Sequence, residues 1–318
     1  MRPLLVLLVK ATYTICPDGL KLAKDQAPIH IAGIPWGKPE ESSYRYEPEC
    51  AFIKLATDIV LVGHGWAPSQ GTREIFVSLS VGPAQKSVRV VGDRTWYKRM
   101  GFMSITKPQP FERMPLIYER AFGGWDRSQN EFGQNTFEPF NPVGVGFRSS
   151  ARHFEEGLHL PNLEDPHHLL EHFGQRVPPA GFGFLSPHWH PRAAFAGTYD
   201  ETWDRTRKPL LPTDFDRRFF NAASPGLVAP GYLQGNEPVV ITNASPRGTL
   251  AFSLPGQAAP VITVERLGVT DVKPEMRLDT VILDTDAEHV LLLWRGHLLL
   301  FESVHEVQAL HITSAGVS

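Results

Sequence analysis

A β-hairpin signal at residues 73–91 constrains the fold more strongly than any other segment of the chain. Residues 73–81 alternate apolar and polar side chains, and the apolar face carries Ile75, Val77, Leu79 and Val81. Residues 82–86 follow as a turn, and residues 87–91 continue as a partner strand. A period of two on either side of a Gly-Pro break predicts an antiparallel hairpin.

Further extended segments lie toward both ends of the chain. Residues 4–9 and 59–62 are short apolar runs typical of buried strands, and Pro17-Asp18-Gly19 predicts a turn after the first of them. Residues 239–242 and 249–254 flank a polar segment and predict a second hairpin. The other strands predicted near the C-terminus are residues 261–267, 277–283, 290–294 and 298–301.

Residues 101–235 differ in composition from both ends. They hold 21 of the 33 Phe, Trp and Tyr residues and 29 of the 55 Gly and Pro residues, with no sustained helical or strand period. Aromatic rings bury large areas, whereas Gly and Pro fix irregular backbone. We therefore expect this region to be ordered by packing and side-chain hydrogen bonds, with a few short helices.

The predicted fold class is mainly β (α+β), with β-sandwich-like strands at both ends and a long irregular middle. The chain divides into an N-terminal β region at residues 1–100, an aromatic, Gly- and Pro-rich region at 101–235 packed on it, and a C-terminal β region at 236–318. We expect these three regions to form one integrated unit.

Charge and cysteine content argue against several classes of protein. The 31 Lys+Arg and 34 Asp+Glu residues give a net charge of −3, which does not suit binding to nucleic acid or to an anionic membrane. Two cysteines, Cys16 and Cys50, cannot form a disulfide framework and fit a reducing compartment. The apolar run at residues 4–9 is short for a signal peptide, and no small-x-small cleavage site follows it. We therefore expect a cytoplasmic protein.

One short motif suggests zinc chemistry. His168-Leu169-Leu170-Glu171-His172 has the H-x-x-E-H order of inverted zinc peptidases, in which two histidines one helical turn apart bind the metal. Asp165-Pro166 and Gly174 predict a helix of about two turns around the motif. The motif residues lie opposite the apolar face of this helix and no third ligand is identifiable, so we favour a solvent-exposed helix over a metal site.

Two other groups of polar residues are weaker candidates for chemistry. His188-Trp189-His190 lies between two prolines, which favours a loop around a packed tryptophan over a pair of metal ligands. Asp214 and Asp216 put two carboxylates on one side of an extended segment, as acid–base catalysis or cation binding requires. The arginines that follow favour ion pairs or turn caps. The sequence contains no G-x-S-x-G motif and no complete dinucleotide loop, so we predict no catalytic residue, metal or cofactor.

Glu112, Arg113, Glu119 and Arg120 stand in an aromatic, proline-punctuated setting at residues 110–126. Arginine pairs bidentately with carboxylates and stacks on aromatic rings, so such sets can lock irregular loops. We interpret the four residues as an internal ion-pair network, with a partner-binding surface as the alternative.

Nine segments of the chain occur in an order that is typical of one family. They are TDIVLVGHGWAP (57–68), VVGDRTW (90–96), PFERMPLIYERAFGGWD (110–126), NPVGVGF (141–147), LPNLEDP (160–166), PAGFGFLSPHWHPR (179–192), AGTYDETW (196–203), LLPTDFDRRFFNAASP (210–225) and GYLQGNEPV (231–239). From about residue 4 to residue 255 the chain resembles the domain-of-unknown-function family numbered 2169. The final sixty residues match less distinctly.

The resemblance implies a role in bacterial type VI secretion. Members of the family are taken to be cytoplasmic adaptors or chaperones that help to load effector toxins, often with a PAAR-type tip domain, onto the VgrG spike. The resemblance therefore implies a non-enzymatic adaptor whose partners are an effector or a PAAR-type tip protein, with the VgrG spike as a further partner. It supplies no catalytic residues.

Two alternatives stay open beside the adaptor. One is a metal- or carboxylate-dependent hydrolase that uses Asp214 and Asp216 or His168 and His172. The other is a structural component of the secretion apparatus. The residues that we select as candidate partner contacts are Glu112, Arg113, Glu119, Arg120, Trp125, Asn141, Asp200, Trp203, Asp214 and Asp216.

Overall fold

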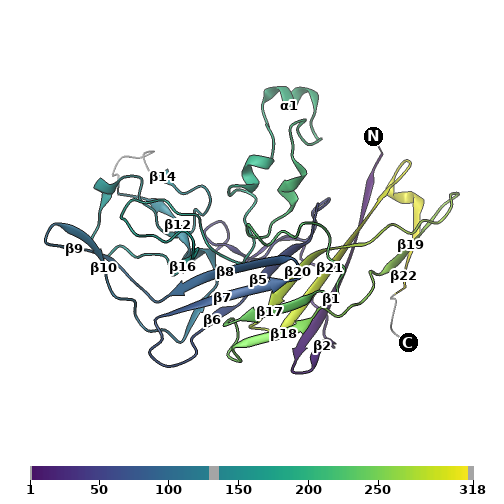
Figure 1. Cartoon of the computed structure of the whole chain (residues 1–318). Coiled ribbons are helices and arrows are strands. Elements are labelled where there is room, and N and C mark those ends of the chain that lie inside the picture. The colour runs from purple at the N-terminus through teal and green to yellow at the C-terminus, as the bar shows by residue number, and fades with distance from the viewer. Residues whose placement is uncertain (1, 129–135, 314–318) are drawn as a thin grey trace.

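The hairpin predicted at residues 73–91 is confirmed in the computed structural model, which describes residues 2–128 and 136–313 (Figure 1). Its strands are β7 (Glu74–Val81) and β8 (Ala84–Val91), and the four apolar residues of the predicted face are buried. The turn is shorter than expected and contains only Gly82 and Pro83. Gly82 has a φ of 51°, a left-handed conformation that glycine adopts without strain.

This hairpin forms the centre of a five-stranded sheet with the order β16-β8-β7-β17-β18. The second predicted hairpin is also confirmed and consists of β17 (Pro238–Thr242) and β18 (Thr249–Ser253). The edge strand β16 (Leu163–Glu164) comes from the middle region. All neighbouring strands in this sheet are antiparallel.

A second five-stranded sheet has the order β2-β1-β21-β20-β5 and contains strands from both ends of the chain. Its strands are β1 (Leu4–Cys16), β2 (Gly19–Leu22), β5 (Asp58–Val62), β20 (Arg277–Asp284) and β21 (His289–Leu299). β5 runs parallel to β20, and the other pairs are antiparallel.

Two strands of this sheet differ from the prediction. The segments at 290–294 and 298–301 are not separate strands, because β21 pairs with β1 without a break as far as Leu299. Residues 4–9 do form a strand, but of these six only Leu7 is buried and Leu4 is 45% exposed. The strand is exposed because this part of β1 lies at the edge of the sheet.

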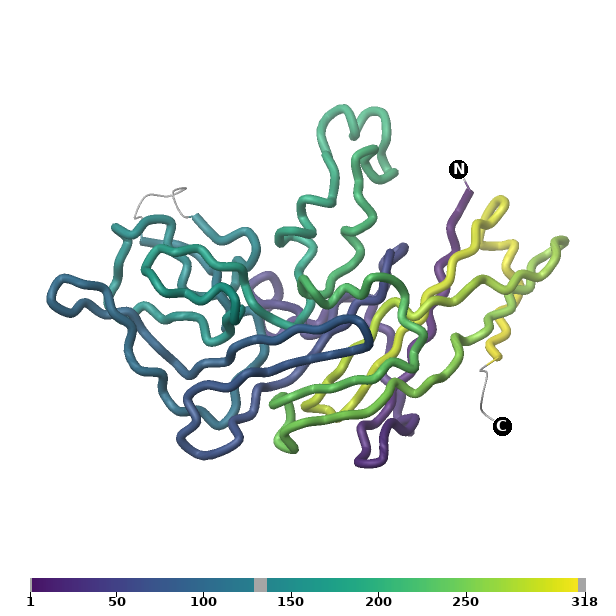
Figure 2. The backbone as a smooth tube through the Cα atoms, viewed as in Figure 1, coloured from purple at the N-terminus to yellow at the C-terminus, as the bar shows by residue number. Residues whose placement is uncertain are grey.

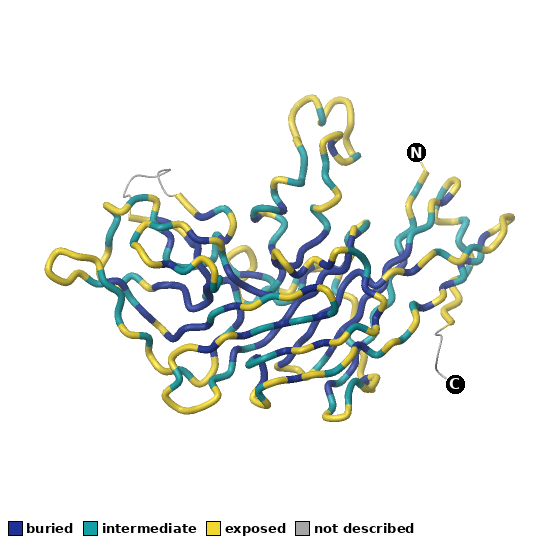
Figure 3. The backbone as a smooth tube through the Cα atoms, in the orientation of Figure 1, coloured by how far each residue is buried: buried dark blue, intermediate teal, exposed yellow. Residues whose placement is uncertain are grey.

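The two sheets pack against each other around one core, so the predicted mainly β fold is confirmed (Figure 1). The core contains Val77 and Ile241 from the first sheet together with Ile59, Val281 and Leu292 from the second. Figure 3 shows that buried residues run along the strands of both sheets, while exposed residues gather at the turns.

The middle region is irregular, as predicted. Its elements are short and surround a second, smaller core that includes Trp96, Phe122 and Phe147.

The remaining elements come from all parts of the chain. The strands outside the two large sheets are β3 (Ile34–Pro35), β4 (Tyr44–Tyr46), β6 (His64–Trp66), β9 (Trp96–Arg99), β10 (Phe102–Ile105), β11 (Arg113–Pro115), β12 (Phe122–Gly123), β13 (Trp125–Asp126), β14 (Thr136–Phe137), β15 (Val145–Gly146), β19 (Val261–Arg266) and β22 (Val307–Thr313). The helices are η1 (Tyr118–Arg120), η2 (Ala151–His153), η3 (Arg192–Phe195), α1 (Glu201–Thr206), η4 (Arg217–Phe220) and η5 (Val304–Glu306).

The helix predicted at residues 165–174 is absent, and that prediction is wrong. Gln175 explains the difference, because its side-chain oxygen accepts from the backbone N–H groups of Glu171 and His172 at 2.9 and 3.1 Å. Its side-chain nitrogen donates to the carbonyl of Leu169 at 3.1 Å. The side chain therefore takes the backbone partners that a helix would have supplied.

Residues 196–216 form an arm that projects from the body of the protein, with α1 at its tip (Figures 1 and 2). The first limb follows η3 and the second limb leads into η4, and these two helices pack against each other at the base of the arm. α1 has six residues, and no helix in the described ranges is long and apolar enough to cross a membrane.

Candidate functional site

A cleft of about 900 Å³ lies between the arm and the end of β1 and β21. The arm and η4 form one wall through Leu211, Phe215, Arg217 and Phe220, among other residues. The other wall consists of Leu4 from β1, the last three residues of β21, and Phe52 with Ile53 from the loop before β5. Phe52 and Leu299 are each more than half exposed, so the cleft presents large apolar side chains to solvent.

Four phenylalanines bring the two walls together at the base of the arm. Phe52 meets the ring of Phe220 edge to face, with ring centres 5.8 Å apart. Phe220 in turn contacts Phe215 and Phe219 at 5.3 and 5.7 Å. Aromatic pairs of this geometry are stabilising, so the ring cluster gives the cleft a preformed floor.

Two arginines give the cleft its charge. Arg207 lines it and donates from Nε to the carbonyl of Leu211 at 2.8 Å, with no carboxylate partner in the described residues. Arg217 also lines it, and its side chain has neither a hydrogen bond nor an ion pair within residues 2–128 and 136–313. None of the described residues lining the cleft is Asp or Glu. The cleft is therefore cationic, although the chain as a whole has a net charge of −3.

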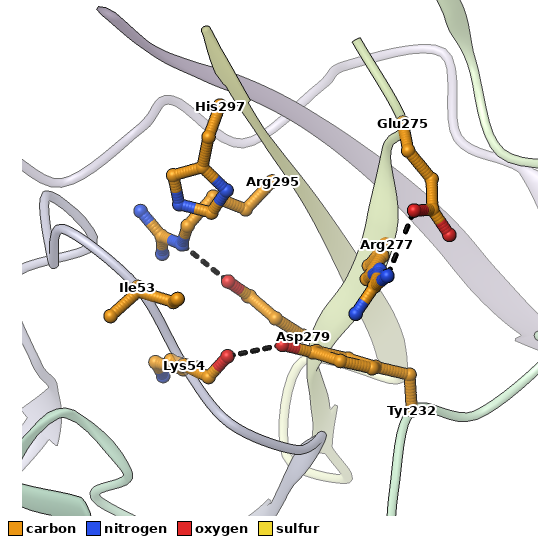
Figure 4. Close-up of a pocket in the computed structure, with 8 residues that line it drawn as sticks. All are labelled: Ile53, Lys54, Tyr232, Glu275, Arg277, Asp279, Arg295 and His297. Carbon is orange, nitrogen blue, oxygen red and sulfur yellow. Dashed lines mark hydrogen bonds and ion pairs between the residues drawn. The ribbon is translucent and has the colours of Figure 1, made fainter. Parts of the chain in front are cut away.

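A smaller polar pocket of about 190 Å³ adjoins the cleft, since Ile53 and His297 line both (Figure 4). Figure 4 shows Arg295 directed at Asp279, Arg277 at Glu275, and Tyr232 at the backbone of Lys54. The cations of this pocket thus have partners already. Its volume is also below the several hundred Å³ typical of small-molecule sites, so the larger cleft is the stronger candidate.

The polar pocket positions the wall of the cleft. Arg295 donates to the carbonyls of Ala51 and Glu49 at 2.5 and 3.1 Å, while His297 Nε2 donates to the carbonyl of Phe52 at 2.6 Å. These bonds fasten the loop before β5 to the face of β21. They fix the direction in which Phe52 projects into the cleft.

Lys54 continues this anchorage into the core. Its Nζ lies 2.9 Å from Glu47, 2.8 Å from Asp58 and 3.0 Å from the hydroxyl of Thr280. Burial alone would lower the pKa of Lys54, but the carboxylates of Asp58 and Glu47 outweigh burial and hold that pKa above its ordinary value. The ammonium group is therefore charged and bridges the loop, β5 and β20.

Four of the predicted contact residues lie in the arm and hold its shape. Asp200 caps α1 by accepting from the backbone N–H of Trp203 at 2.8 Å, and Trp203 Nε1 donates to Leu210 across the arm at 2.7 Å. Asp214 accepts from the N–H and the hydroxyl of Thr198 at 3.0 and 2.7 Å, which ties the two limbs together. Asp216 caps η4 and pairs with Arg218, as expected for a turn cap.

Glu112, Arg113, Glu119 and Arg120 do not form the expected ion-pair network with one another. Glu119 instead accepts from the N–H and hydroxyl of Ser43, both at 2.7 Å, and Arg120 pairs with Asp93 at 3.2 Å. Glu112 and Arg113 are both exposed, Arg113 as the first residue of β11 and Glu112 directly before it. The prediction of mutual pairing is wrong because the two Glu-Arg pairs lie on separate elements that meet other loops.

Trp125 and Asn141 also lie outside the cleft. Trp125 is 42% exposed on β13 and stacks on Phe137 with ring centres 4.6 Å apart. Asn141 is fully buried, and its Nδ2 donates to the carbonyls of Tyr118 and Phe122 at 2.8 and 3.0 Å. Asn141 therefore joins irregular segments of the middle region.

The histidine motifs do not form a site. His168 is exposed and contacts Asp165 at 3.1 Å, in a turn where the helix needed by the zinc motif is absent. Trp189 is buried against Tyr118 in a loop, as predicted for the segment 188–190. Within the described residues no group of three or more His, Cys, Asp or Glu side chains could hold a metal ion.

Sequence reasoning missed the residues that line the cleft. Leu4 and Leu299 belong to segments that it assigned to strands, and Phe52 follows no period. Arg207 and Arg217 were close to predicted residues, and the segment LLPTDFDRRFF at 210–220 does supply much of one wall. The segment at 210–220 is therefore a sequence signal for the wall formed by the arm and η4. The opposite wall has no such signal, because its residues come from segments that are far apart in the chain.

A family model described as "Uncharacterized protein conserved in bacteria (DUF2169)" matches residues 1–295. The match extends beyond the expected limit at residue 255 and includes β20 and most of β21. Comparisons with curated proteins and with solved structures find no match.

Proposed function

We propose that this chain, which belongs to the bacterial family DUF2169, is a non-enzymatic adaptor that holds a client protein in the cleft between the arm and the end of β1 and β21. The observation that carries the proposal is the cleft itself, which combines exposed apolar side chains with two arginines that have no carboxylate partner in the described residues. Protein interfaces are built around such apolar and arginine anchors.

The construction of the cleft favours a preformed binding surface. The phenylalanine cluster, the Asp214–Thr198 bonds and the anchored loop before β5 fix both walls in the free protein. A surface fixed in advance loses little conformational entropy when a partner binds. A volume of about 900 Å³ can accept several side chains of a protein segment.

The client that we propose is a type VI secretion effector or its PAAR-type tip domain, which the adaptor keeps competent for loading onto the VgrG spike. This part of the proposal comes from the family resemblance. A client held at a cationic cleft must present acidic and apolar groups, and it must be released when the spike assembles. A cleft that is open to solvent on one side allows the client both to bind and to be released.

Affinity capture tests the adaptor function. The tagged full-length chain is expressed in its bacterial host, captured, and analysed by mass spectrometry, with the metal content measured on the same eluate. We expect one effector or tip protein in stoichiometric amount. The variant Phe52→Asp should lose this partner, because it puts a carboxylate into the apolar wall, whereas Phe102→Asp makes the same change on exposed β10, outside the cleft, and should keep it.

Three results would contradict the proposal. An eluate without a partner but with about one equivalent of a divalent metal would favour the hydrolase, in line with metal-assisted chemistry. Recovery of the chain with sheared spike particles would favour a structural component of the apparatus. Equal capture by both phenylalanine variants would remove the cleft from the binding site.

A further inference from the structure

One edge of β1 has backbone groups without partners. β1 pairs with β21 from Leu4 to Thr14, but on its other side β2 covers only residues 13–16. Thr12 shows which groups face outward, because its N–H donates to Gln26 and its carbonyl accepts from Ala23, both away from β21. In an antiparallel pair this orientation alternates with a period of two.

The outward-facing groups therefore belong to Leu4, Val6, Leu8 and Lys10. Within residues 2–128 and 136–313, no backbone or side-chain group forms a hydrogen bond with the N–H or carbonyl of any of these four residues. Lys10 shows that the edge is open to solvent, because its side chain is 2% exposed while the residue as a whole is not buried. The exposed atoms of Lys10 are thus main-chain atoms.

An open edge of this kind selects an extended protein segment as its partner. Unpaired N–H and carbonyl groups spaced by two residues match those of another strand, which is the basis of recognition by strand addition. The side chains of Leu4, Val6 and Leu8 are all partly or largely exposed on one face of β1, so the added strand would place apolar side chains beside them.

The free edge leads into the cleft, because Leu4 belongs to both. A segment added along β1 and continued past Leu4 would enter a space lined by Arg207 and Arg217, where no Asp or Glu side chain of the described residues is present. Two arginines without carboxylate partners select a segment that carries negative charge at this end.

We propose that an extended segment of the client, with alternating apolar side chains and carboxylates at one end, adds as a strand to the free edge of β1. Its carboxylates pair with Arg207 and Arg217 in the cleft. This inference rests on the proposed adaptor function and specifies the part of the client that is recognised.

Two synthetic peptides test the inference with the full-length chain. They are fluorescein-labelled Val-Thr-Val-Thr-Val-Thr-Asp-Asp and its counterpart with both aspartates at the other end, since the strand can run in either direction. Binding is measured by fluorescence polarisation. We expect one of them to bind, and the same peptide with lysines in place of aspartates to bind at least about tenfold more weakly.

Two pairs of variants separate the backbone from the side-chain contribution. Val6→Pro removes an outward N–H without removing a bond to β21, and should weaken binding at least about tenfold, while Val6→Thr retains the N–H and should bind normally. Arg207→Glu with Arg217→Glu should make the protein prefer the lysine peptide. Arg205→Glu makes the same kind of charge change on α1, outside the cleft, and should not.

Hydrogen exchange makes the test independent of whether Val6→Pro folds. The amides of Val6 and Leu8 should exchange more slowly in the wild-type chain when the peptide is bound. Failure of both peptides to bind, or binding without this protection, would overturn strand addition even if affinity capture had identified a client.

Two other occupants of the edge would also overturn the inference. A wild-type dimer that Val6→Pro converts to a monomer would show that a second copy of the chain pairs with β1. Peptide binding that appears only after truncation at Thr313 would show that the chain's own C-terminal residues occupy the edge. If capture yields no client but the peptides bind as expected, the adaptor function fails while the recognition mode stands.

Discussion

Replacing Lys54 by methionine should destabilise the protein by about 3 kcal/mol, because it leaves two buried carboxylates without their shared cation. Lys54, Glu47 and Asp58 are each at most 5% exposed, and the Nζ lies within 3 Å of both carboxylates. Breaking a buried ion pair by removing one partner costs about 3–5 kcal/mol. Methionine is unbranched and keeps the apolar stem of lysine while lacking the ammonium group, so the change reports mainly on the charge.

The lower end of this range applies because each carboxylate keeps another donor. Asp58 still accepts from Asn221 and from the N–H of Ala222 at 2.9 and 2.8 Å, and Glu47 still contacts Arg192 at 3.2 Å. For a chain of this size, 3 kcal/mol corresponds to a fall in Tm of about 4–5 °C.

Urea unfolding followed by circular dichroism measures the loss, with Tm from a thermal scan as a second readout. Lys21→Met is the matched control, because Lys21 pairs with Asp18 at 2.8 Å in an exposed turn, where the same substitution should cause no measurable change. A Lys54 variant within about 1 kcal/mol of the wild type would refute the reasoning, since the buried carboxylates would then not depend on Lys54.

Three further predictions concern the middle region and the arm. Burial opposes ionisation of Asp126, yet hydrogen bonds from Ser128, Ser149 and His153 hold its pKa well below its ordinary value. Ionised Asp126 therefore stabilises the fold above its unfolded-state pKa of about 4, and this stabilisation is lost progressively as the pH falls below that value. Asp126→Asn should accordingly make stability, measured by urea unfolding from pH 5 to 2, fall less steeply with decreasing pH. Asn141→Ala should cost about 2 kcal/mol in the same assay, because two buried carbonyls lose their donor, and an unchanged midpoint would contradict the contacts described. Asp214→Ala should speed tryptic cleavage after Arg207 severalfold by releasing Thr198 from the opposite limb, whereas Asp204→Ala, at an exposed pair near the tip, should alter the rate less.

The strands of this protein follow from local sequence patterns, whereas the cleft and the free edge of β1 do not. Period-two alternation is a local property, so Ile75 and Val77 identify their strand without knowledge of its neighbours. A binding surface consists of residues from distant segments, and here Phe52, Arg217 and Leu299 meet only after both ends of the chain have joined one sheet. No local pattern marks such a group.

The candidate contact residues show the same division. The arginines that follow Asp214 and Asp216 predict ion pairs or turn caps for both carboxylates. Asp216 has both roles, since it caps η4 and pairs with Arg218, whereas Asp214 has neither and accepts hydrogen bonds from Thr198 on the opposite limb of the arm. The Glu-Arg pairs at 112–113 and 119–120 are close in sequence, which predicts one network. Their actual partners, Ser43 and Asp93, come from segments that the sequence could not place beside them.

The amino-acid sequence by itself determined the mainly β fold, two hairpins and an irregular, aromatic middle, because each follows from the conformational preferences of neighbouring residues. Tertiary structure decided the rest. It paired β5 in parallel with β20 across more than 200 residues and left one edge of β1 open beside a cationic cleft. Those outcomes depend on which backbone groups and charges find partners far along the chain, and this is a property of the packed molecule.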